Sequence, residues 1–139
     1  MTQETKNIIA STAPLIKEKK EEITTTMYEI MFTNHPEVKE LFKNAEPTQY
    51  KKLANAVYAY AANIDKLDAL KAGIETMAQA HIKTNVAPEH YPIVGESLLA
   101  AITKVLNPNQ EVLDAWAQAY EFLANILIQR EKELYAQKA

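Results

Sequence analysis

The sequence predicts an all-α protein made of one domain. Its 139 residues match the usual size of a single domain. Apolar residues recur at spacings of three and four along most of the chain, which is the period of an amphipathic helix. Only 2 glycines are present, too few for the many turns of a β-sandwich or β-barrel. We therefore expect a bundle of packed helices.

The first third of the chain predicts two helices and then a short one. The first helix spans residues 2–17, and Pro14 is expected to bend or interrupt it near its end. The second helix spans residues 20–33, where the apolar side chains fall on one face. The residue before Pro36 avoids the helical region, so this helix ends there. A short helix over residues 36–41 follows, because proline is favoured at a first helical position.

Four longer helices are expected in the rest of the chain. Residues 42–47 are interpreted as a loop, and polar or proline-containing breaks separate the apolar stretches that follow. Several crossing directions fit this pattern better than a simple up-down bundle, because prolines interrupt the chain repeatedly. The four predicted helices span residues 48–64, 67–83, 90–106 and 109–135.

Composition excludes several classes of function. The net charge of −3 and the single arginine, Arg130, argue against nucleic-acid binding. The absence of cysteine excludes disulfides, thiolate metal sites and cysteine nucleophiles, and is typical of a cytoplasmic protein. We see no signal peptide and no apolar run long enough for a membrane span. Neither glycine lies in a phosphate-binding loop, and the length leaves no room for an added nucleotide or flavin domain.

One histidine stands out. The three histidines are too far apart in sequence to form a helical zinc motif. His81 continues an apolar stripe through Ile74 and Met77, so its imidazole is expected to point inward. A lone histidine there is more often a core residue than a ligand. An inward imidazole whose second nitrogen meets an acceptor is nevertheless what a haem iron requires.

Four stretches together carry a resemblance to a known family. The stretches are Ile23–Tyr28, His35–Val38 with Leu41 and Phe42, His81 with Tyr91–Gly95, and Glu131 with Leu134 and Tyr135. In their order and spacing they resemble a bacterial single-domain haemoglobin, close to the globin domain of flavohaemoglobins. The likeness covers essentially the whole chain, and it implies one globin domain over residues 1–139, with three helices over three around haem b and no reductase domain.

On this resemblance, His81 is the proximal ligand of the haem iron, with Tyr91 and Glu131 beside it. A carboxylate that accepts the ring N–H sets the tautomer and makes the imidazole more electron-donating. Alternatives remain open from the residues alone. Glu131 lies in a charged stretch where Glu133 is a rival, and Tyr91 could be an aromatic residue that packs at a helix start.

On the distal side, the resemblance assigns Tyr28 as hydrogen-bond donor to the bound ligand; the alternative is a tyrosine that faces solvent. Phe42 is implied to stack on the porphyrin, Leu53 to lie over the iron and Gln49 to be the distal glutamine. The chain departs from the family in two ways. Its loop between Phe42 and Gln49 is shorter, and Tyr50 replaces a common proline.

The resemblance implies a haem protein that reversibly binds O2, NO and CO. The first hypothesis is a nitric oxide dioxygenase that depends on a separate reductase. The second is an oxygen storage or delivery protein without turnover. A third is a sensor, which normally needs an output domain. The oligomeric state, monomer or dimer, is left open. Among other residues, Trp116 and Tyr60 are expected in the core, His35 in a turn, and His90 at the surface or near a haem edge.

Overall fold

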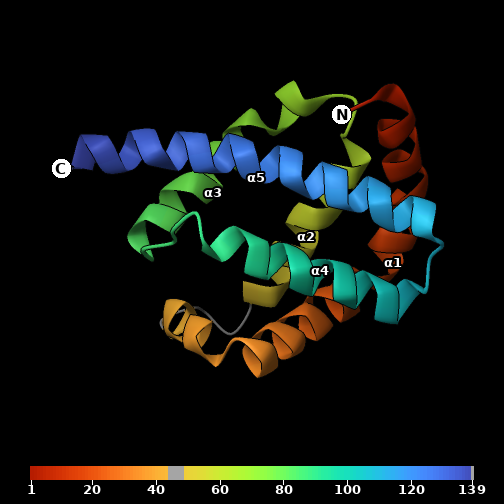
Figure 1. Cartoon of the computed structure of the whole chain (residues 1–139). Helices are drawn as coiled ribbons and strands as arrows, with labels where there is room; N and C mark the ends of the chain where they lie inside the picture. The colour runs from red at the N-terminus through yellow and green to blue at the C-terminus, as the bar shows by residue number, and fades with distance from the viewer. Residues whose placement is uncertain (44–48, 139) are drawn as a thin grey trace.

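The computed structural model describes residues 1–43 and 49–138, and these residues form helices joined by short connections (Figure 1). The described ranges contain no strand, which agrees with the expected all-α class. Two of the helices, η1 and η2, are short 3₁₀ helices, and the others are α-helices. In chain order they are α1 (Gln3–Asn34), η1 (Pro36–Phe42), α2 (Gln49–Ala62), η2 (Leu67–Leu70), α3 (Lys71–Lys83), α4 (His90–Leu106) and α5 (Gln110–Lys138).

Helix α1 corrects the prediction of two separate N-terminal helices. It is continuous through Pro14, and its first part (red) and last part (orange) run in different directions (Figure 1). Pro14 lies on the exposed side, so the carbonyl of Ala10 that loses its partner can be hydrated. On the inner side, fully buried Ile9, Ile16 and Ile23 keep both parts packed on the core. Packing of this face therefore keeps the helix continuous through the proline.

The later helix boundaries agree with the sequence apart from small shifts. Phe42 ends η1 and does not begin a loop, whereas most of the predicted loop and the predicted helix start at Thr48 lie outside the described residues. The helix expected from Leu67 begins as the 3₁₀ turn η2. Helix α4 has the predicted bounds, and it ends where Asn107 adopts a left-handed conformation with φ 47°.

The main core lies where α1, α2, α4 and α5 meet. Trp116 is 1% exposed, and its indole N–H donates to Thr12 Oγ1 at 3.2 Å, which confirms its place in the core. Tyr60 is also buried, as predicted, and its hydroxyl donates to the Ala119 carbonyl at 2.6 Å. These hydrogen bonds satisfy the polar ends of two large buried rings.

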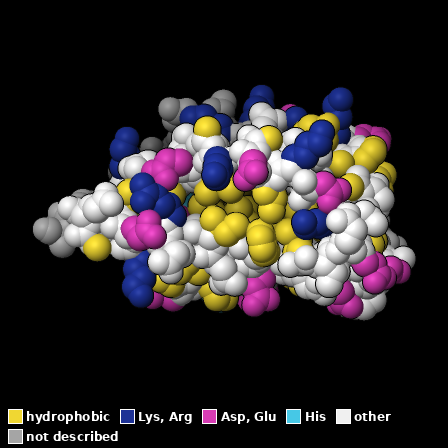
Figure 2. Space-filling model, turned by 90° about the horizontal axis from the view of Figure 1, so that it is seen from above, with side chains coloured by type: hydrophobic (Ala, Val, Ile, Leu, Met, Phe, Trp, Pro, Cys, Tyr) yellow, Lys and Arg dark blue, Asp and Glu magenta, His cyan; other side chains and the backbone are white. Residues whose placement is uncertain are grey.

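A second, smaller core joins α3 and α4 to the second half of α5. At its surface, Arg130 on α5 donates from Nε and Nη2 to the two carboxylate oxygens of Glu75 on α3, at 2.7 and 3.2 Å. On the face seen in Figure 2, hydrophobic side chains gather in the middle and charged ones lie around them. Among the described residues, no helix has the length and apolar character needed to cross a membrane.

Candidate functional site

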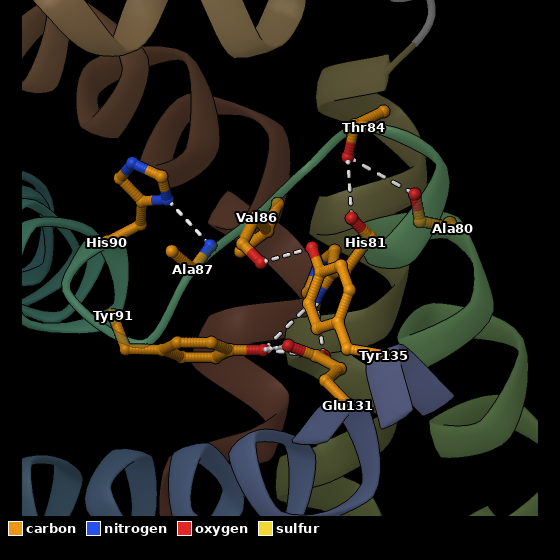
Figure 3. Close-up of polar contacts among 9 residues, drawn as sticks. All are labelled: Ala80, His81, Thr84, Val86, Ala87, His90, Tyr91, Glu131 and Tyr135. Atoms are coloured by element: carbon orange, nitrogen blue, oxygen red, sulfur yellow. Dashed lines mark hydrogen bonds and ion pairs between the residues drawn. The ribbon is translucent and has the colours of Figure 1, made fainter. Parts of the chain in front are cut away.

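Three side chains from three helices meet at the C-terminal end of α3. His81 lies near the end of that helix, and its Nδ1 is 2.8 Å from Glu131 Oε2 and 3.0 Å from the Tyr91 hydroxyl (Figure 3). Tyr91 comes from the first turn of α4 and Glu131 from α5. Residues separated by 10 and 50 positions in sequence are thus brought together around one imidazole nitrogen.

The hydrogen bonds in this cluster have a definite direction. Glu131 is only 4% exposed, and the Tyr91 hydroxyl donates to its two oxygens at 2.8 and 2.7 Å. Burial raises the pKa of Tyr91 well above its usual value, and the nearby Glu131 carboxylate raises it further, so the phenol keeps its proton. Because Glu131 is an acceptor, the proton of the neutral His81 ring is best placed on Nδ1. The lone pair is then on Nε2.

Nε2 of His81 has no recorded polar partner among the residues that the structure describes. Each recorded hydrogen bond and ion pair of the ring goes through Nδ1, and its other recorded contact is an edge contact with the Tyr91 ring, with centroids 6.0 Å apart. The His81 side chain is 28% exposed, so the ring is not sealed in the core. His81 therefore has the arrangement expected of a ligand histidine: Nδ1 is held by an acceptor, and Nε2 remains for a metal.

The structure also distinguishes the two candidate carboxylates of α5. Glu131 reaches His81, whereas Glu133 accepts a hydrogen bond from Arg130 Nη1 at 3.0 Å on the surface. Tyr91 does more than pack as an aromatic residue at a helix start, because its hydroxyl donates a hydrogen bond to Glu131. All three residues of the predicted proximal group are brought together.

The last turns of α5 also hold the connection that follows His81. The Tyr135 hydroxyl donates to the Val86 carbonyl at 2.7 Å, and the Val86 amide donates to the His81 carbonyl at 3.0 Å (Figure 3). Asn85, between them, adopts a positive φ of 62° that closes the turn. Glu131 and Tyr135 lie one helical turn apart on α5, so this helix positions both the ring and the main chain of His81.

A second group of predicted residues gathers on α1, η1 and α2. The rings of Tyr28, Phe32 and Phe42 contact one another, with centroids 5.4 to 5.7 Å apart. Tyr28 is half-buried and so does not simply face solvent. Phe32 was not assigned a site role from sequence, although its position one turn after Tyr28 was a signal that the two rings share a face.

Gln49 joins this group at the first turn of α2. Hydrogen bonding by its side chain lowers the pKa of Tyr28, against the larger effect of burial. The start of α2 is held against α1 because the Thr24 hydroxyl donates to the Tyr50 carbonyl at 3.0 Å. Leu53, one turn after Gln49, is half-buried and packs on the main core. The start of α2 thus lies against the part of α1 that leads to Tyr28, despite the unusual residue at position 50.

The buried phenol of Tyr28 predicts a loss of stability at alkaline pH. Burial raises the Tyr28 pKa from 10.0 to about 12, while the hydrogen bond with Gln49 acts in the opposite direction. The folded state therefore favours the neutral phenol, and its contribution to stability is present below pH 10 and lost as the pH rises towards about 12. Urea unfolding between pH 8 and 12 should show a shallower decline for Tyr28→Phe than for the wild type. Equal slopes would contradict this.

The other two histidines lie outside both groups. His35 lies in the turn after α1, as predicted. Its Nδ1 is 3.3 Å from Glu37 and its Nε2 is 3.9 Å from Glu96. His90 accepts a hydrogen bond from the Ala87 amide at 2.9 Å through Nδ1 (Figure 3). Each of these imidazoles thus has a local structural role.

These residues fit haem better than a metal held by protein ligands alone. Within the described ranges, no group of three or more His, Cys, Asp or Glu side chains could hold a metal ion. A single imidazole nitrogen therefore suits a metal that brings its other ligands in a macrocycle. Half-buried aromatic and apolar side chains at Phe32, Phe42 and Leu53 suit a flat apolar ring system.

Comparison with known proteins gives consistent matches. The sequence model of the family named Globin matches residues 25–127. An uncharacterized globin-like protein of Aquifex aeolicus is 54% identical over 137 residues, which is 99% of each chain. A flavohemoprotein of Halalkalibacterium halodurans is 42% identical over 140 residues; the match covers 97% of this chain but 34% of that protein.

A solved structure gives the same result for the fold. It is an engineered carbene transferase and putative nitric oxide dioxygenase from Rhodothermus marinus. The two chains superpose with a TM-score of 0.93 and 37% identity, over 98% of this chain and 96% of the other. The predicted fold class is confirmed by this agreement over nearly the whole length.

Proposed function

Because the chain belongs to the globin family, as its sequence indicated, we propose that it binds haem b through Nε2 of His81. The observation that carries this proposal is the His81–Glu131–Tyr91 cluster, in which Nδ1 is held by a buried carboxylate and Nε2 is left for a metal. Phe42 and Leu53 would supply apolar contacts to the ring system.

The chain's own residues would tune the bound group. When bound, haem supplies an iron that takes diatomic gases and exchanges one electron. Glu131 accepts the Nδ1 proton of His81 and makes the imidazole a stronger electron donor. Tyr91 donates to the same carboxylate and holds it in place. Since Glu131 is buried, water does not compete strongly for these hydrogen bonds.

Tyr28 would act on the gaseous ligand. Its raised pKa keeps the phenol protonated at neutral pH, so the hydroxyl can donate a hydrogen bond to O2 or NO. Contacts with Phe32 and Phe42 restrict the ring, and Gln49 would orient its hydroxyl. Gln49 itself offers a second donor through its amide.

We propose that the reaction is the dioxygenation of nitric oxide. Combining one NO with one O2 and one electron gives nitrate, so atoms and charge balance only if an electron donor is present. Support comes from the Rhodothermus relative, a putative nitric oxide dioxygenase, and from the electron-donating imidazole that the cluster predicts. The donor of the electron would be a separate flavin-containing reductase, in line with the likeness to one third of a flavohemoprotein.

To test this, the reduced, oxygen-saturated holoprotein is mixed with nitric oxide, and NADH and a cellular reductase fraction are then added. We expect rapid oxidation of the haem with about one nitrate per haem, as the stoichiometry requires, followed by re-reduction and many nitrates per haem. Stopped-flow absorbance and a nitrate assay provide the two measurements. Fast oxidation with no re-reduction by any fraction of the cell extract would contradict turnover and favour storage or delivery of oxygen.

A further inference from the structure

The most informative residue outside the described site is Tyr120 on α5. Its hydroxyl donates to the main-chain carbonyl of Tyr91 at 2.7 Å. Tyr91 is therefore held to α5 at both ends, because its own hydroxyl donates to Glu131 farther along the same helix. A helix is a stiff spacer, so Tyr120 and Glu131 set the position of Tyr91 together.

Gly95 allows this contact. A Cβ at that position would lie 2.6 Å from Tyr120 Cε2, which is closer than real Cβ atoms approach. The Tyr120 ring can thus lie directly against the backbone of α4. Burial raises the Tyr120 pKa and keeps the hydroxyl protonated, while the Gly95 backbone acts on the pKa in the opposite direction. The contact involves the turn of α4 that carries Tyr91.

We propose that Tyr120 is a positioning residue of the haem site: by holding the Tyr91 carbonyl, it keeps the Tyr91 hydroxyl and the Glu131 carboxylate in register behind His81. The inference rests on the proposed binding of haem by His81. Carbonyls in the first turn of an α-helix already face the amide four residues later, so the Tyr120 hydroxyl is an additional contact on the Tyr91 carbonyl.

The experiment compares the wild-type holoprotein with Tyr120→Phe and a matched control, Tyr60→Phe. The control also loses one buried tyrosine hydroxyl that donates to a backbone carbonyl, that of Ala119 at 2.6 Å, but that hydroxyl does not contact the His81 cluster. Both variants should lose similar thermal stability. Only Tyr120→Phe should lower the iron–histidine stretching frequency of the reduced protein and speed haemin loss about 10-fold, the low end for outer-shell partners of a metal-bound histidine.

A second variant reaches the same contact from the other side. Gly95→Ala retains the Tyr120 hydroxyl but places a methyl group against its ring, so we expect it to shift the stretching frequency in the same direction. An unchanged frequency in Tyr120→Phe, or an equal shift in Tyr60→Phe, would overturn the inference while wild-type haem binding stands. A wild-type protein that shows no iron–histidine band at all would overturn the proposed function itself.

Discussion

Replacing His81 with glycine should remove stable haem binding while leaving the helical fold intact. Partners one step removed from a metal typically change its affinity about 10- to 100-fold, so loss of the ligand itself should speed haemin loss by more than about 100-fold. The side chain is partly exposed and is not part of the main core, so the fold does not depend on its packing. The measurement is the rate of haemin transfer to an excess of apomyoglobin.

The control for this variant is His35→Gly, which removes an imidazole from a turn. It should retain haem at the wild-type rate. Added imidazole should restore haem binding to His81→Gly, because the ring can enter the space left beside Glu131. Equal haem retention by the wild type and His81→Gly would remove His81 from the site.

The second large effect is expected at Tyr28. Tyr28→Phe should speed the dissociation of O2 from the reduced holoprotein by about 10- to 150-fold, because a hydrogen bond to a charged acceptor is worth about 1.5–3 kcal/mol. The contacts with Phe32 and Phe42 involve the ring and not the hydroxyl, so the variant should keep its fold. Flash photolysis and stopped-flow displacement by CO measure the rate.

Tyr58→Phe is the matched control for this change. Tyr58 is a half-buried tyrosine on α2 whose ring lies under the Lys20 ammonium, at 5.7 Å. Its variant should release O2 at the wild-type rate. An off-rate of Tyr28→Phe within a factor of two of the wild type, by contrast, would be too small for a lost hydrogen bond to the ligand.

Local signals in the sequence predicted some helices better than others. Helix α4 has the predicted bounds, because a connector with proline precedes it and Asn107 before Pro108 ends it. The predicted separation of α1 into two helices is wrong, because the buried isoleucines on the inner side keep the helix continuous past Pro14. Tertiary packing of this kind is invisible to a window of neighbouring residues.

The candidate site shows the same division. The resemblance pointed to His81, Tyr91 and Glu131, and the structure brings them within hydrogen-bond distance. The residues alone could not choose between Glu131 and Glu133, because the choice depends on which side of α5 faces α3. The helical period places Tyr120 on the inner side of α5, but it does not show that its hydroxyl reaches Tyr91 on α4. That contact depends on Gly95, which has no side chain and so lets the Tyr120 ring lie against α4.

The most direct test of haem binding through His81 is a titration of the haem-free protein with haemin, followed by reduction. We expect saturation at about one haemin per chain and a five-coordinate reduced form whose resonance Raman spectrum contains an iron–histidine band. That band should be lost in His81→Gly. Failure of the folded protein to bind haemin, or a histidine band that persists in this variant, would contradict the claim that His81 holds the haem.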